Sequence, residues 1–180
     1  MNVNVFMSDF YETTYGENHH EAILYKANSK WSFEFHEKLI QQMENNPKLK
    51  FYSKITENKP FAFKTYLDKI SNRNRRSYMT RMRCGSHRLH VEIGRWTNLQ
   101  QLMRKCRFCD SGLIEDEEHV ILDCQAFVNQ REEFFSKVCS IVPNFMNTDR
   151  DEKLRLMFMD ELQIPMITQE FISRISMKIK

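Results

Sequence analysis

The chain is poor in the residues that interrupt helices, with four glycines and four prolines among its 180 residues. This shortage argues against a turn-rich β-sandwich or barrel and favours helices. No run of about 18 apolar residues occurs, so we expect no membrane span. The N-terminal segment has no basic region followed by an apolar stretch, so we expect no secretory signal. Five cysteines without an export signal indicate a reducing, intracellular compartment, either the nucleus or the cytoplasm.

The apolar content is sufficient for a packed core, because 41% of the residues are hydrophobic and they include 14 phenylalanines and 11 methionines. Apolar residues at helical spacing predict helices. These helices are expected over about residues 21–42, 60–71, 73–84 and 127–142, and from Pro165 onward. The sequence therefore predicts a small, mainly α domain with little or no sheet. Its expected parts are a leader with one helix (1–45), a basic and cysteine-containing module (46–135) and C-terminal helices (136–180).

Residues that begin or end helices support these limits. Pro47 is expected to end the first helix, Gly85 the third and Pro143 the fourth. Thr148, with Asp151 three residues later, is expected to cap a further helix. The side chains expected to face inward in the first and fourth helices are Ile23, Leu24, Trp31, Phe35, Leu39 and Met43, and Phe127, Phe134, Phe135, Val138 and Ile141.

Positive charge is concentrated in one segment. Residues 73–107 contain ten basic residues, nine of them arginine, and a single acid, Glu92, which gives a formal charge of +9 in a chain whose total is +3. Such segregation favours a surface for a polyanion. Arginine suits phosphate and stacked bases better than lysine does. A solvated, arginine-rich helix face is the simpler alternative.

The helix expected over residues 73–84 offers one arginine-rich stripe. Arg73, Arg76, Thr80 and Arg83 fall at offsets of 0, 3, 7 and 10, which is one face of an α-helix. Tyr78, Met79 and Met82 are expected to pack inward on the other side. Trp96 can stack on a base or anchor the core, and its neighbour Gly94 favours the core. The residues expected to contact nucleic acid are Arg73, Arg76, Arg81, Arg83, Arg88 and Arg95.

Cys106, Cys109, His119 and Cys124 have the spacing C-x2-C-x9-H-x4-C. A thiolate pair two residues apart, followed by a histidine and another cysteine, has the ligand types and the spacing for one tetrahedral Zn²⁺. Four protein ligands close the coordination shell, so such a zinc is structural. The alternative is that the four are ordinary buried residues. His87 and His90 are too isolated in the sequence to be expected as ligands.

Four consecutive acids, at positions 115–118, lie between the second cysteine and His119. Acids at a helix start complement the helix dipole, so we expect a helix that begins there and runs through Val120, Ile121 and Leu122. The same acids repel phosphate. The preceding arginine-rich helix is therefore the better surface for nucleic acid.

The segment 81–96, read with Arg104, the four Cys and His residues, Phe127 and Arg131, resembles the region that follows the polymerase in non-LTR (LINE-type) retrotransposon reverse transcriptases. The resemblance covers about residues 46–135. It implies a C-terminal region with a CCHC zinc site that helps to hold element RNA or target DNA. The chain has no Tyr-x-Asp-Asp polymerase motif, so we expect a fragment or remnant that cannot copy RNA by itself.

Enzyme activity is not expected. Asp151-Glu152-Lys153 provides half of a carboxylate nuclease motif, but no Pro-Asp pair precedes it. Cys84 and Cys139 lack an activating context for a nucleophile. Two functions remain open. In the first, the module binds RNA or DNA, with a reverse transcriptase polymerase domain as a further partner, and binds neither a membrane nor a small-molecule substrate. In the second, it is a zinc-stabilised helical tail that docks on a protein, without contact to nucleic acid.

Overall fold

The computed structural model describes residues 19–56, 66–158 and 163–179, and their side chains except those of residues 19–29, 31 and 32. The chain divides into two compact units, one ending at Asn45 and the other beginning at Asn46. The first contains helix α2 (His19–Asn45), which ends before Pro47 as predicted. Met43 is buried, whereas Phe35 is exposed, so the prediction that Phe35 faces inward was wrong. Ile23, Leu24 and Trp31 and the predicted leader 1–16 lie outside what the structure describes.

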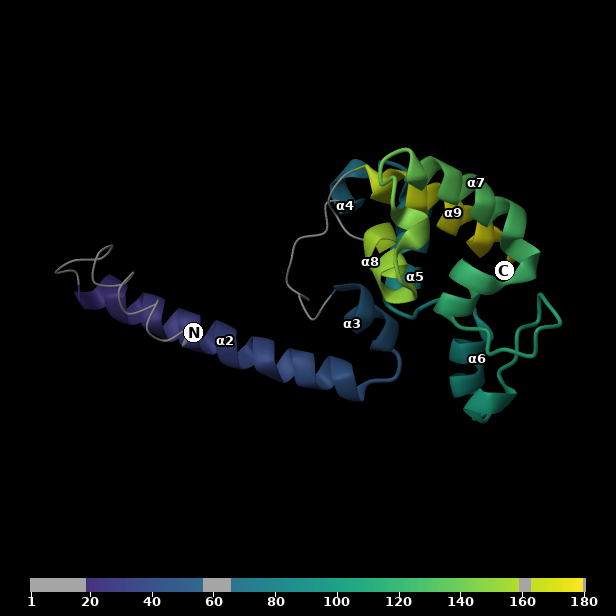
Figure 1. Ribbon diagram of the computed structural model, residues 1–180. Helices are drawn as coiled ribbons and strands as arrows, with labels where there is room; N and C mark the ends of the chain where they lie inside the picture. Colours follow the sequence, from purple (N-terminus) through teal and green to yellow (C-terminus); the bar gives the residue numbers. More distant parts are fainter. Residues whose placement is uncertain (1–18, 57–65, 159–162, 180) are drawn as a thin grey trace. The chain divides into compact units, whose positions relative to one another are not determined.

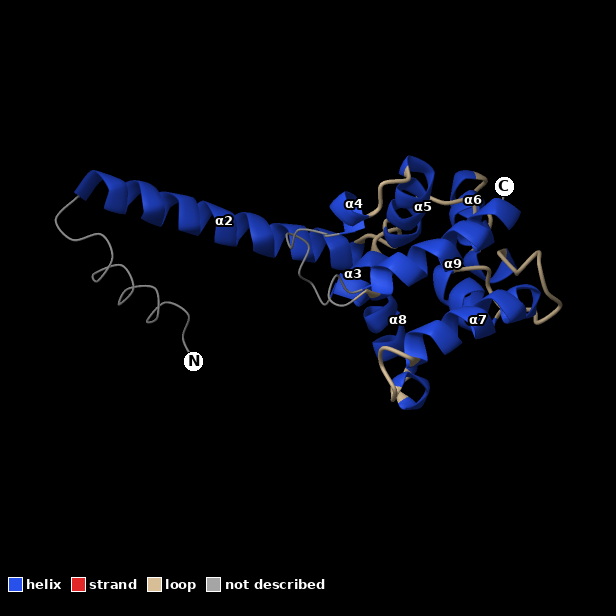
Figure 2. Cartoon of the chain, turned by 90° about the horizontal axis from the view of Figure 1, so that it is seen from above, coloured by secondary structure: helices blue, strands red, loops and turns tan. Residues whose placement is uncertain are grey.

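The second unit is built from helices (Figures 1 and 2). They are α3 (Lys50–Thr56), α4 (Tyr66–Lys69), α5 (Arg73–Arg83), α6 (His90–Trp96), α7 (Val128–Cys139), α8 (Arg150–Phe158) and α9 (Ile164–Lys178), with short turns η1 (Gln101–Met103), η2 (His119–Asp123), η3 (Gln125–Phe127) and η4 (Phe145–Asn147). Within 19–56, 66–158 and 163–179 there is no sheet, and the single isolated β-bridge joins Lys105 to Ile114. The predicted mainly α fold is confirmed. No helix in these ranges is long and apolar enough to cross a bilayer.

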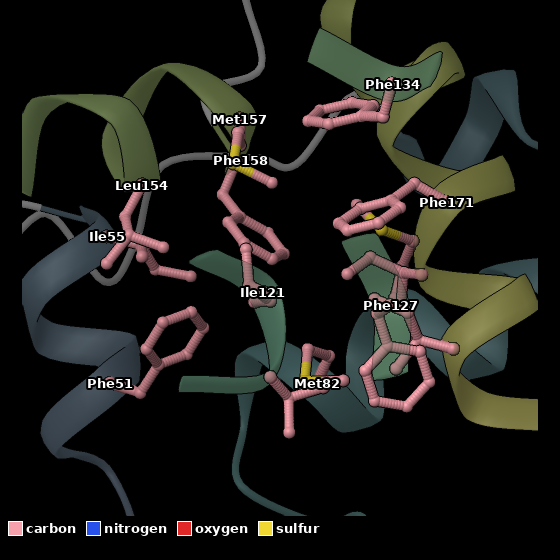
Figure 3. Packing of buried hydrophobic residues seen from close by; sticks show 14 of the residues in the cluster. Phe51, Ile55, Met82, Ile121, Phe127, Phe134, Leu154, Met157, Phe158 and Phe171 are labelled. Atoms are coloured by element: carbon pink, nitrogen blue, oxygen red, sulfur yellow. The ribbon is translucent and has the colours of Figure 1, made fainter. Parts of the chain in front are cut away.

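Helix α9 packs against α5, α7 and α8, and α3 packs against α8 and α5. Phe134 of α7 stacks on Phe171 of α9 with ring centroids 4.7 Å apart, and Phe51 of α3 meets the edge of Phe158 of α8 (Figure 3). Ile121, from the segment that carries the cysteines and histidine, is fully buried in the same core. Helix α7 runs through position 135. The C-terminal helices and the cysteine-containing segment therefore share one core.

Helix α5 begins and ends as its sequence requires. The side chain of Asn72 accepts a hydrogen bond from the backbone N–H of Arg75 at the N-terminus. At the other end Gly85 has a φ of 60°, which a residue with a Cβ rarely adopts. A Cβ on Gly85 would also lie 2.5 Å from the carbonyl oxygen of Lys48. Glycine at this position therefore ends α5 and allows the close approach of the residues before α3.

The remaining helix limits follow the sequence with small shifts. Helix α7 ends at Cys139, before Pro143, and α9 has Pro165 in its first turn as predicted. The cap of α8 is Asp149, whose Oδ1 accepts a hydrogen bond of 2.8 Å from the N–H of Glu152. Thr148 donates instead to the carbonyl of Phe145, so the predicted cap was wrong by one residue. Of the helix predicted over 60–71, only α4 lies within the described residues.

Candidate metal centre

The four predicted ligands come together in the structure. The ligand atoms of Cys106, Cys109, His119 and Cys124 all lie within 4.8 Å of one another. The sulfurs of Cys106 and Cys124 are 3.8 Å apart, and Nε2 of His119 lies 3.3 Å from the sulfur of Cys109. His119 and Cys124 are buried, and the other two are half-buried. Three sulfurs and one imidazole nitrogen can therefore bind a metal ion at one point.

The first pair of ligands is placed by a short hairpin. The N–H of Cys106 donates to the carbonyl of Leu113, and the N–H of Glu115 donates to the carbonyl of Arg104. Between these bonds the chain reverses, and Gly112 takes a φ of 70° in the turn. The N–H of Phe108 points back at the sulfur of Cys106, at 3.4 Å. The hairpin therefore turns both sulfurs of the C-x2-C pair toward the same side.

The second pair is placed by a stretch of π-helix, η2. His119 and Cys124 are five residues apart, which on an α-helix separates two side chains by about 140° around the axis. In the structure the N–H of Cys124 donates to the carbonyl of His119 at 2.7 Å, the wider spacing of a π-turn. The wider turn brings residues five apart onto one side. The H-x4-C spacing therefore suits a π-turn, which places both ligand side chains on the same side.

Glu115 holds the hairpin to α6. Its side chain is fully buried and accepts hydrogen bonds from the backbone N–H groups of His90 and Arg107. The guanidinium of Arg107 donates to both carboxylate oxygens, at 3.0 and 2.7 Å. A buried carboxylate is tolerated only when it is paired and hydrogen-bonded in this way. Glu115 thus ties the residue after Cys106 to the first turn of α6.

Two further acids of this loop have side-chain partners, whereas Asp116 accepts a hydrogen bond from the backbone N–H of His119. Glu117 binds Nε2 of His87 at 2.7 Å. Glu118 binds Lys54 at 2.8 Å and Arg150 at 3.4 Å. These pairs join the metal segment to its neighbours. His90 bonds to the carbonyl of Lys105. Both His87 and His90 are thus held by hydrogen bonds and lie outside the ligand cluster.

The environment sets which cysteine loses its proton first. Burial raises the pKa of Cys106 and raises that of Cys124 to about 12. Burial also acts to raise the pKa of Cys109, but hydrogen bonds with Ser111 and His119 outweigh it and lower the pKa to about 6. Without a metal ion, Cys109 is therefore the thiolate at neutral pH and the other two are thiols.

Arg131 lies against the buried side of the cluster. Its side chain is only 7% exposed, and its Nη2 donates to the carbonyl of Cys124 at 3.0 Å. Its Nη1 is buried and has no hydrogen-bond partner. Nδ1 of His119 is likewise buried without a partner. A buried cation with an unused donor is costly unless a negative charge lies nearby.

The predicted arginine stripe on α5 has a different role in the structure. Arg83 is 2% exposed, donates to the carbonyl of Phe158 at 2.7 Å and lies over the ring of Tyr66. Thr80 bonds to the hydroxyl of Tyr66, and Arg76 donates to the carbonyl of Leu67 in α4 and to that of Ile70, just after it. The prediction that Arg83 contacts phosphate is therefore wrong. A buried cation between the C-termini of α5 and α8 complements both helix dipoles instead.

The other predicted arginines divide into two groups. Arg73, Arg81 and Arg88 are exposed, and none has an acidic partner within the described ranges. Arg95 is half-buried, pairs with the buried Glu92 and donates to the carbonyl of Pro47. Exposed Arg75, which the stripe argument missed, belongs with the first group.

The helical position of buried Met79 marks the exposed side of α5 in the sequence. Arg73, Ser77 and Arg81 recur every four residues on the side opposite Met79. The predicted arginine stripe instead included residues that pack on α4 and α8. Trp96 is 68% exposed, so the expectation that it anchors the core was wrong.

Comparison of the chain with models of protein families, with curated proteins and with solved structures finds no match.

Proposed function

We propose that the cluster binds one Zn²⁺ ion as a structural centre. Two sulfurs about 2.3 Å from a tetrahedral zinc are separated by about 3.8 Å. This is the distance between the sulfurs of Cys106 and Cys124. Three thiolates and an imidazole are typical zinc ligands and leave no open position for a substrate. The donor set and its spacing support zinc with a folding role.

The zinc would join a hairpin that contributes little to the core to a π-turn that is part of it. The hairpin that carries Cys106 and Cys109 has mostly exposed or half-buried residues, whereas the π-turn with His119 and Cys124 is buried. Zinc ligation would fasten the hairpin to the π-turn and hence to α7. A structural zinc of this type contributes its binding free energy to folding. The hairpin is the part whose order is expected to depend on the metal.

We further propose that the zinc-stabilised unit binds RNA or DNA, without catalysis of its own. The observation that supports this is the exposure of Arg73, Arg81 and Arg88 without acidic partners in the described chain. Unpaired guanidinium groups are free to contact phosphate. The resemblance to the C-terminal region of non-LTR reverse transcriptases supports the same proposal. It implies a fragment or remnant of such a protein, placed in the nucleus or cytoplasm beside a polymerase domain.

The test combines elemental analysis with titration of a labelled oligonucleotide at several salt concentrations. One zinc per chain is expected, with binding that weakens steeply as salt rises because phosphate contacts release counterions. The double variant Arg73→Glu with Arg81→Glu should retain zinc and lose most binding. Lys38→Glu with Lys50→Glu is the matched control, since both lysines are exposed and the change in net charge is the same.

Three outcomes would contradict the proposals. Absence of zinc would refute the metal assignment. One zinc without oligonucleotide binding would favour the protein-docking tail, whose apolar contacts are nearly independent of salt. Equal losses in the arginine and the lysine double variants would show that binding follows net charge, and would refute the assignment to α5.

A further inference from the structure

The second unit has an apolar group on its surface close to the metal segment. Trp96, the last residue of α6, is 68% exposed, and Leu102 and Met103 of the following turn are 77% and 57% exposed. Figure 1 shows α6 beside the loops of the metal segment. Three large apolar side chains exposed within eight residues are more than the scattered single residues that a surface normally shows.

The backbone under this group is held firmly. The N–H of Leu99 donates to the carbonyl of Gly94 at 2.7 Å, and the guanidinium of Arg104 donates to the carbonyls of Leu99 and Val91. The side chain of Arg104 covers Gly94 so closely that a Cβ there would lie 2.6 Å from it. Arg104, rather than Trp96, therefore occupies the space that Gly94 leaves. The exposed indole is therefore attached to a backbone that is already ordered, so binding a ligand there costs little further backbone entropy.

The segment that carries the indole, residues 73–107, exposes side chains of one charge sign only. Glu92, the single acid between residues 73 and 107, is 2% exposed and is paired with Arg95 and Lys48. Lys105 is exposed, and its carbonyl bonds to Nδ1 of His90 at the other end of α6. Along α6 the distance from His90 to Trp96 is roughly 9 Å. The surface thus combines an exposed aromatic ring with an exposed cation nearby and no exposed acid in that segment.

We propose that Trp96 is a stacking platform for an unpaired base of single-stranded nucleic acid, with Lys105 contacting the backbone of the same strand. This inference rests on the proposed nucleic-acid function and specifies its ligand. A ring of this kind cannot reach the face of a base inside a duplex, whereas single strands present their bases for stacking. Charge complementarity favours a phosphate-bearing strand over an apolar protein partner, because the segment 73–107, which contains the apolar group, exposes basic side chains and no acidic one.

The test uses the zinc-bound full-length chain and a short oligothymidine, together with a duplex of the same length. Trp96→Ala should weaken binding of the single strand by about 5- to 150-fold, the range for loss of one stacked base. The salt dependence should not change, because no phosphate contact is removed. Trp96→Phe should recover most of the affinity, since a phenyl ring still stacks. Leu102→Ala, which removes an equally exposed apolar side chain, should change affinity less than twofold.

The outcomes separate this inference from the proposed function. If Trp96→Ala binds the single strand as the wild type does, while the double arginine variant does not, the stacking role is refuted and the phosphate surface stands. If Leu102→Ala weakens binding as much as Trp96→Ala, the contact is general apolar packing and the inference is wrong. If the wild type binds neither nucleic acid, the proposed function fails first. A wild-type preference for single strand that Trp96→Ala abolishes would support the inference.

Discussion

Replacement of Arg131 by methionine should weaken zinc binding more than it destabilises the metal-free chain. Three thiolates and one Zn²⁺ carry a net negative charge, and in the structure the buried guanidinium of Arg131 lies at the carbonyl of Cys124 with one nitrogen unpaired. Asp123 and Glu132 already favour the charged form of Arg131, and the metal centre would add a negative charge on its buried side. Arg131 is therefore expected to stabilise the zinc-bound state through charge as well as through its hydrogen bond.

The magnitude follows from two opposing effects. Loss of a hydrogen-bonding residue that supports a metal ligand typically lowers metal affinity by about 10- to 100-fold. This corresponds to about 1.4–2.8 kcal/mol. In the metal-free chain, the change removes one of two donors to the carbonyl of Cys124, which keeps its hydrogen bond from the N–H of Phe127, and this costs about 0.5–1.5 kcal/mol. Removal of a buried cation, whose desolvation is the largest influence on its pKa, offsets part of that cost. The two states should therefore respond differently.

The assay is a competition titration against a chromophoric chelator, combined with urea unfolding of the chain with and without zinc. Arg131→Lys keeps the charge and should retain more zinc affinity than Arg131→Met. Arg83→Met is the matched control, because Arg83 is equally buried and also donates to a backbone carbonyl, that of Phe158. It should lower stability without weakening zinc binding specifically. A zinc affinity of Arg131→Met within twofold of the wild type, or an equal loss in Arg83→Met, would refute the reasoning.

Acid should release the zinc. Burial raises the pKa of the thiols of Cys106 and Cys124, so zinc binding at pH 7–9 displaces about two protons. In a chelator titration, the zinc affinity should therefore fall about 100-fold for each pH unit by which the pH is lowered. Alkylation followed by mass spectrometry should modify at most Cys84 and Cys139 in the zinc-bound chain, and all five cysteines after chelation. Gly85→Ala should lower the free energy of unfolding by about 1–3 kcal/mol, and by more than Gly112→Ala, whose φ is similar but whose Cβ would meet no atom within 4 Å. These expectations would be contradicted by a zinc affinity that does not change with pH, by ligand cysteines that resist alkylation after chelation, or by equal losses of stability in Gly85→Ala and Gly112→Ala.

The sequence was most informative where the determinants are local. The C-x2-C and H-x4-C spacings are short, and each pair is positioned by its own turn, so the cluster follows from the pattern without knowledge of the rest of the fold. Gly85 ends α5 through its own backbone angle. The helices follow from the repeat of apolar residues. In each case the cause lies within about five residues of its effect.

Prediction failed where the deciding contact is distant in the chain. Arg83 is buried because the carbonyl of Phe158, 75 residues later, accepts its hydrogen bond. The space beside Gly94 is filled by Arg104, ten residues later, and Trp96 is exposed. No periodicity within α5 or α6 contains this information. Residue type shows that an arginine is charged, and tertiary structure decides whether the charge faces a helix C-terminus or the solvent.

Two arginines on one helix turn make this distinction measurable. Arg81 is exposed and has no acidic partner in the described chain, whereas Arg83 is buried against Tyr66 and Phe158. Both lie in the same basic segment, so a binding surface inferred from composition treats them alike. If exposure decides, Arg81→Gln should leave the free energy of unfolding unchanged and should reduce the log–log salt slope for single-strand binding by about 0.7, the value for one phosphate contact. Arg83→Gln should leave the slope unchanged and should lower the free energy of unfolding by about 1–3 kcal/mol, because the carbonyl of Phe158 loses its donor. A change of slope in Arg83→Gln, or none in Arg81→Gln, would mean that the segment binds through its total charge rather than through the side chains that the fold leaves exposed.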